Sequence, residues 1–159
     1  MTDTTAAAAS RRTVTLSRHF DASPSEVYRA WTDPEEVAQW YGPDGWYAPA
    51  DRSRIDTTAG GRWEVTMIRR SDGFEFPIGY EILELVEPLL VVLRHTEQDP
   101  GGSGATIVRV ELTADGEGTL MTLSDGPMET YGADSAESGY QQAFEKLAAR
   151  LGMGRSESV

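Results

Sequence analysis

The C-terminal part of the chain has a periodic pattern of apolar residues. Over residues 134–151, apolar side chains recur at steps of three and four, which places them in one stripe along a helix. The stripe consists of Ala136, Tyr140, Ala143, Phe144, Leu147, Ala148 and Leu151. Asp134 and Glu137 have the spacing of a capping box, and Gly152 stands where a helix terminator is expected. The pattern predicts a helix that packs one face against another element.

Between residues 13 and 124, apolar and polar residues alternate in several runs, as in half-buried β-strands. The expected strands are residues 13–20, 62–67, 74–86, 89–96, 105–112 and 119–124. In the fourth of these, the alternation turns Leu89, Val91, Leu93 and His95 inward. Turns or loops that contain glycine separate most neighbouring strands, and Glu87-Pro88 separates the third from the fourth, so we expect an antiparallel meander.

Two short helices are predicted after the first strand. The run Ser-Pro-Ser-Glu at residues 23–26 combines a capping serine, a proline at the first helical position and a glutamate three residues after the cap. Residues 33–36, Asp-Pro-Glu-Glu, begin a second helix in a similar way. The apolar spacing turns Trp31 and Trp40 toward the interior.

Residues around these two helices, and others spread over the predicted sheet and last helix, form a recognisable set. The first group comprises Arg18, His19, Phe20, Asp21, Ala22, Ser23, Pro24, Val27, Ala30, Trp31, Thr32, Asp33, Pro34, Glu35, Trp40, Gly42, Pro43 and Gly45. The second comprises Asp56, Gly60, Gly61, Trp63, Gly79, Glu84, Pro88, Gly118, Thr119, Thr122, Gly139 and Tyr140. With these residues, the chain resembles bacterial START-like (SRPBCC) proteins similar to the C-terminal domain of the heat-shock chaperone ATPase activator. The resemblance covers about residues 11–152.

This resemblance implies an α+β helix-grip fold. Such a fold has a curved antiparallel seven-stranded sheet wrapped around a long C-terminal helix, with two short helices after the first strand and a cavity between sheet and helix. It places a second strand over residues 48–56, which hold few apolar side chains and should therefore form an edge. It also places residues 125–133, read as a connection, near the cavity mouth as a candidate lid.

Length and composition fit one globular domain. The 159 residues are divided into a tail over residues 1–10, a domain over residues 11–152 and a second tail over residues 153–159. The net charge of −12 disfavours nucleic acids and anionic membranes as partners. No apolar run is long enough for membrane insertion, and the N-terminus lacks a basic region before an apolar one, so we expect a cytoplasmic protein.

Chemistry at sulfur or at a metal is not expected. The chain has no cysteine and two histidines on different strands, which disfavours a transition-metal site. It contains no phosphate loop, nucleophile elbow or paired metal-ligand motif, so we expect no cofactor.

Three functional hypotheses remain open. The first is binding of a small hydrophobic or amphipathic molecule in the implied cavity. Its candidate binding residues are Trp31, Trp40, Trp63, Met67, Tyr80, His95, Met121, Tyr140 and Phe144. Taken singly, each of these is more often a core residue than a ligand contact. Glu84 is a further candidate polar group.

The second hypothesis is that the protein is a cyclase or dehydratase in which His95 acts as general base beside Glu81 or Glu97. The simpler interpretation is that His95 is a half-exposed histidine at the end of a strand. The third is modulation of a chaperone ATPase, which the resemblance suggests and which we rank below ligand binding. A homodimer through an exposed strand edge is also compatible with the resemblance, although nothing in the sequence fixes the oligomeric state.

Overall fold

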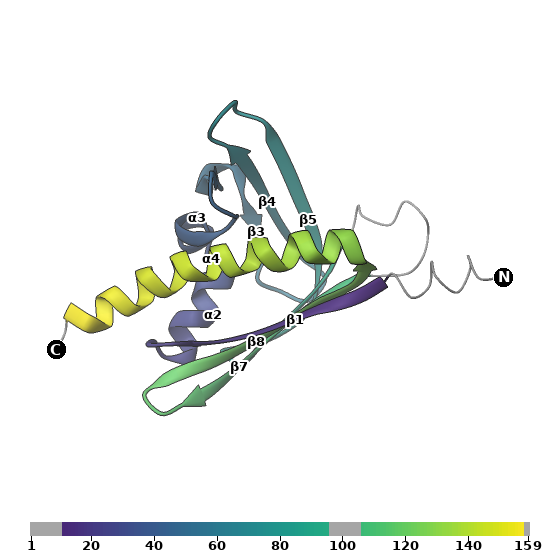
Figure 1. The fold of residues 1–159 in the computed structure, drawn as a ribbon. Helices are drawn as coiled ribbons and strands as arrows, with labels where there is room; N and C mark the ends of the chain where they lie inside the picture. The colour runs from purple at the N-terminus through teal and green to yellow at the C-terminus, as the bar shows by residue number, and fades with distance from the viewer. Residues whose placement is uncertain (1–10, 96–105, 158–159) are drawn as a thin grey trace.

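The computed structural model describes residues 11–95 and 106–157, with side chains described as far as Leu151. The described residues form eight strands and three α-helices, whose arrangement is shown in Figure 1. In chain order the elements are β1 (Arg11–Phe20), α2 (Pro24–Thr32), α3 (Pro34–Trp40), β2 (Trp46–Tyr47), η1 (Ala50–Arg52), β3 (Arg54–Ile55), β4 (Arg62–Arg69), β5 (Glu75–Val86), β6 (Leu90–His95), β7 (Ile107–Asp115), β8 (Gly118–Glu129) and α4 (Thr130–Glu157). The predicted tail over residues 1–10 lies outside the described residues.

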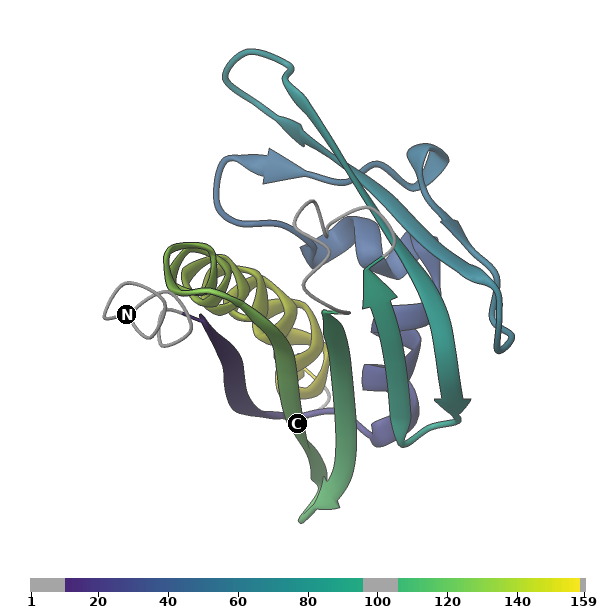
Figure 2. The same cartoon turned by 90° about the vertical axis from the view of Figure 1, so that its right-hand side faces the viewer.

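All strand pairs are antiparallel, in the order β1-β8-β7-β6-β5-β4-β2, with β3 also paired to β4. The strands β4 to β8 form the predicted meander. Figure 2 shows the sheet curving around α4, which lies on its concave side. The helix-grip fold is therefore confirmed.

The expected second strand is present only as two short pieces. Residues 48–56 were predicted to be one strand, but within this range only Arg54 and Ile55 form a strand, β3. Strand β2 lies just before the range, and the 3₁₀ turn η1 separates the two pieces. Both pieces pair with β4 at the edge of the sheet, as their low apolar content predicted. If these pieces are counted as one interrupted strand, the sheet has the expected seven strands.

The starts of the two short helices are confirmed. The Ser23 hydroxyl accepts a hydrogen bond from the Glu26 backbone N–H at 3.2 Å, and the Glu26 carboxylate accepts one from the Ser23 N–H at 2.9 Å. Asp33 caps α3 by accepting from the Glu35 N–H at 2.9 Å. These local bonds satisfy N–H groups that a helix leaves free at its start.

Both predicted ends of the last helix are wrong. Helix α4 begins at Thr130, four residues before the predicted cap Asp134, and continues past Gly152 to Glu157. The carboxylates of Asp134 and Glu137 accept hydrogen bonds from the Arg12 guanidinium on β1 instead, at 2.7 and 2.8 Å. A partner from a distant strand has replaced the local cap.

The predicted connection over residues 125–133 is not a loop. Its first five residues complete β8, and the other four form the first turn of α4. Strand and helix follow each other directly, so a separate lid segment does not exist here. A smaller error concerns Leu89, which was expected inward but lies in the turn before β6 and is 48% exposed.

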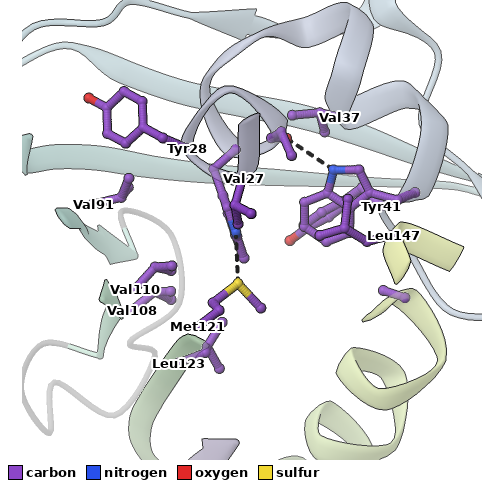
Figure 3. Packing of buried hydrophobic residues seen from close by; sticks show 14 of the residues in the cluster. Val27, Tyr28, Val37, Tyr41, Val91, Val108, Val110, Met121, Leu123 and Leu147 are labelled. Atoms are coloured by element: carbon purple, nitrogen blue, oxygen red, sulfur yellow. Dashed lines mark hydrogen bonds between the residues drawn. The ribbon is translucent and has the colours of Figure 1, made fainter. Parts of the chain in front are cut away.

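One apolar core fills the space between the helices and the sheet. Val91, Leu93, Val108 and Val110 on neighbouring strands are buried, as the alternation predicted. Figure 3 shows part of this packing, with Met121 pointing from β8 toward α2. None of the helices in the described part of the chain is both long and apolar enough to span a membrane.

Candidate functional site

A pocket of about 500 Å³ lies between the first half of α4, the end of α3 and strands β4 and β5. Its lining residues are mainly apolar or aromatic. They are Tyr41, Gly42, Pro43, Trp46, Met67, Phe76, Ile78, Tyr80, Asp125, Tyr131, Gly132, Ser135, Ala136, Gly139, Tyr140 and Ala143. The α4 wall is composed largely of small residues, which leave room between the helix and the sheet.

Strand register brings Asp125 to this pocket. Met121, Leu123 and Asp125 are alternate residues of β8, and all three are buried. Because alternate residues of a strand face the same side, the carboxylate points inward with the core residues before it. Asp125 is only 3% exposed, so its charge lies in a largely apolar environment.

Two groups approach the Asp125 carboxylate. The Tyr140 hydroxyl on α4 donates a hydrogen bond to Oδ2 at 2.7 Å. His95 Nε2 lies 3.5 Å from Oδ1, without the geometry of a hydrogen bond. Neither Nε2 nor Oδ1 has a hydrogen-bond partner among the described residues. The site therefore retains unused hydrogen-bonding capacity at a buried carboxylate.

Three tyrosine side chains near this carboxylate are held in their neutral, protonated form. Burial raises the pKa of the Tyr80 and Tyr140 phenols well above the ordinary value of 10, and it also raises that of Tyr41. The nearby Asp125 charge acts in the same direction on all three. At neutral pH the three side chains are therefore hydroxyl groups that can donate or accept hydrogen bonds.

Eight of the nine candidate binding residues fall into two groups. Met67, Tyr80 and Tyr140 line the pocket. Trp31, Trp40, Trp63, Met121 and Phe144 lie in the hydrophobic core, each at most 2% exposed. Whether any of them contacts a ligand stays a prediction.

The three core tryptophans have internal hydrogen-bond partners. The indole N–H groups of Trp40 and Trp63 donate to the backbone oxygens of Ala30 and Trp31 at 3.0 and 2.8 Å. The Trp31 N–H donates to the Met121 sulfur at 3.3 Å, the bond drawn as a dashed line at Met121 in Figure 3. Their polar groups are thus used within the core.

His95 lies beside the pocket rather than in its lining. Its ring packs edge-on against Tyr80, with 4.5 Å between ring centroids. The expected neighbour Glu81 accepts a hydrogen bond from Arg94 instead, and Glu97 lies outside the described residues. Glu84 is exposed and does not line the pocket. The carboxylate beside His95 is Asp125, which was not predicted from the sequence.

A signal for Asp125 was present in the sequence. The expected strand over residues 119–124 stopped five residues before the end of β8, because residues 125–133 were read as a connection. Extending the alternation of Met121 and Leu123 by one step would have placed Asp125 on the inner face.

Two other pockets of similar volume have a different character. One, of about 480 Å³ between β1 and α4, is bordered by the exposed ion pair of Arg18 and Glu145. The other, of about 470 Å³, lies over β3 and β4 beside Arg52 and Glu64. Neither combines an apolar wall with a buried carboxylate, so we place the candidate site at the first pocket.

The model of the family "Activator of Hsp90 ATPase homolog 1-like protein" matches residues 21–152, most of the chain. The chain belongs to this family. The activator-like family lies within the START-like (SRPBCC) superfamily, so the resemblance stated from sequence is confirmed. None of the curated proteins matches the chain in sequence.

Solved structures agree with this assignment. A protein from Chromobacterium violaceum is 26% identical and superposes with a TM-score of 0.78, over 87% of this chain and 96% of that one. An AHSA1 protein from Silicibacter pomeroyi is 22% identical with a TM-score of 0.75, over 90% and 99% of the two chains. A protein from Nitrosomonas europaea is 20% identical with a TM-score of 0.74, over 89% and 95%.

Membership of the activator-like family establishes the fold but no ligand, because one fold supports many functions. The function must be argued from the pocket and from its polar end. Among the described residues, no group of three or more histidine, aspartate or glutamate side chains is arranged to hold a metal ion.

Proposed function

We propose that this protein binds a small amphipathic molecule in the pocket between α4 and strands β4 and β5. The observation that carries the proposal is a pocket of about 500 Å³ with apolar and aromatic walls and one buried carboxylate among its lining residues. Small-molecule sites typically have this composition, with a few polar groups that fix orientation within an apolar surface.

Two features of the polar end support specific binding. Tyr140 and Asp125 hold each other by a hydrogen bond, so the carboxylate has a fixed position before a ligand arrives. Tyr41 and Tyr80 are buried phenols whose raised pKa keeps them neutral. Together these groups offer hydrogen bonds at one end of the pocket, while Met67 provides adaptable apolar surface nearby.

Native mass spectrometry of the gently purified protein tests the proposal. We expect a mass above that of the bare chain, and denaturation should release a small molecule whose class can then be identified. The variant Gly139→Leu tests the location, because a Cβ at Gly139 would lie 3.9 Å from Pro43, across the pocket wall. A leucine there should fill the pocket and remove the retained molecule.

The matched control is Gly139→Ala. Its Cβ makes only ordinary contacts and replaces glycine by a better helix former, so retention should be unchanged. Equal retention by the leucine and alanine variants would contradict this location. A bare chain that also fails to bind added amphipathic probes would contradict the proposed function itself.

A second candidate function, proton transfer on the bound molecule, is favoured by one observation. His95 Nε2 and Asp125 Oδ1 lie 3.5 Å apart beside the pocket, an arrangement in which a carboxylate can orient an imidazole base. If the retained molecule is a substrate, His95→Ala should abolish its conversion while leaving retention intact. Unchanged conversion in that variant would exclude His95 as the base.

A further inference from the structure

We propose that the ligand carries a protonated amine on a flat apolar body, and that Asp125 binds this amine. The inference rests on the proposed function and names the chemical class of the molecule bound. It follows from the charge, hydrogen bonding and walls of one end of the pocket.

The carboxylate is the first line of support. Asp125 is only 3% exposed. The hydrogen bond that it accepts from Tyr140 uses a small part of the capacity of its carboxylate to accept hydrogen bonds. Oδ1 has no hydrogen bond from the described residues. Burying a charged carboxylate with so few hydrogen bonds costs free energy unless a hydrogen-bond donor, preferably a cation, compensates the charge. An ammonium group supplies both the positive charge and the hydrogen-bond donors.

The charge of the lining residues gives the second argument. Among the described residues that line the pocket, Asp125 is the only charged one. The nearby guanidinium of Arg69 is stacked on Trp46 and Phe74 and held by Asp72 at 2.7 Å, and Arg69 is not part of the lining. An anionic ligand would meet a buried negative charge without a compensating cation in the wall. The net charge of −12 also favours the approach of cations.

The walls supply the third argument. Aromatic rings line the pocket from several elements, and the faces of such rings attract cations. They belong to Tyr41, Trp46, Phe76, Tyr80, Tyr131 and Tyr140. The same rings offer flat apolar surface for the remainder of the molecule.

His95 is the competing cation at this carboxylate. When it is protonated it pairs with Asp125 from outside the pocket lining, which reduces the charge available to an amine. The other groups around Asp125 are the phenols of Tyr41, Tyr80 and Tyr140, which remain neutral.

The test compares three probes of one shape by isothermal titration calorimetry: 2-naphthylmethylamine, 2-naphthylmethanol and 2-naphthoate. The amine should bind the unaltered protein at least about tenfold more tightly than either other probe, the difference expected of a charge-assisted hydrogen bond. Asp125→Asn should reduce this preference by about tenfold. The control Asp115→Asn, at an exposed carboxylate on β7, should not change it.

The outcomes separate the two proposals. If no probe binds, this inference fails, and the proposed function fails with it when native mass spectrometry also finds a bare chain. If the alcohol or the carboxylate binds as tightly as the amine, only this inference fails. A preference retained in Asp125→Asn would also overturn it. Near-ultraviolet circular dichroism shows whether each variant is folded, and the comparison of probes on the unaltered protein requires no variant.

Discussion

At the scale of single residues, the large apolar side chains divide between the core and the pocket. Phe144 belongs to the core: its ring lies 6.5 Å from that of Phe20, 6.2 Å from that of Trp40 and 5.7 Å from that of Tyr140, centroid to centroid. Phe74 on the β4–β5 hairpin is 52% exposed, although it contacts Trp46. Similar side chains therefore have different energetic roles.

Replacing Phe144 by alanine should lower the free energy of unfolding by about 3 to 5 kcal/mol, because it removes a buried ring and leaves a cavity. The adjoining surface pocket between β1 and α4 favours the lower half of that range. Urea denaturation measures the loss. Phe74→Ala, the matched control, should cost less than about 1 kcal/mol. A Phe144 variant as stable as the control would show that this ring is not part of the core.

At the scale of elements, the beginning of α4 is joined to β1 by one guanidinium. Arg12 contacts both Asp134 and Glu137, which lie on the turns of α4 that also form the pocket wall. A second contact between the same elements, Arg18 with Glu145, lies further along the helix. All five side chains are about one third exposed or more, so we expect local rather than global effects from their loss.

Arg12→Gln should increase amide hydrogen exchange in the first turns of α4, because the two carboxylates lose their shared partner. Exchange near Glu145 should remain unchanged in this variant. The control Arg18→Gln should show the reverse pattern, with faster exchange around Glu145 and none of the effect at Asp134. Identical profiles in the two variants would mean that these contacts do not hold the helix locally.

At the scale of the whole molecule, one continuous core joins the helices to the sheet, so the domain is expected to unfold cooperatively. A change in the charge of one buried group therefore changes the free energy of unfolding of the whole domain. The buried phenols make this testable through pH. Their pKa is raised in the folded state, whereas an unfolded chain returns them to about 10. Their contribution to stability is therefore complete below about pH 10 and is lost as the pH rises above that value.

Unfolding by urea should accordingly show stability that falls as the pH rises above about 10. Lys146 acts in the opposite direction, since burial lowers its pKa, so a paired comparison is needed. Tyr140→Phe should reduce the slope of stability against pH because one buried phenol is removed. A slope equal to that of the unaltered protein would contradict the assigned burial of this hydroxyl.

The sequence by itself determined the features that depend on near neighbours in the chain. The capping box of α2 joins Ser23 and Glu26, three residues apart, and the strand alternation depends on residues two apart. Such interactions form within one element, so spacing alone predicts them. The family motifs added the order of the elements and hence the fold.

Only the tertiary structure decided the features that depend on distant neighbours. Asp134 and Glu137 have the spacing of a cap, but α4 begins earlier and Arg12, more than a hundred residues away, binds both. Asp125 meets His95 and Tyr140 because strand register and helix packing bring three elements together. Long-range pairs of this kind leave no spacing signal in the chain, since the intervening fold sets their distance.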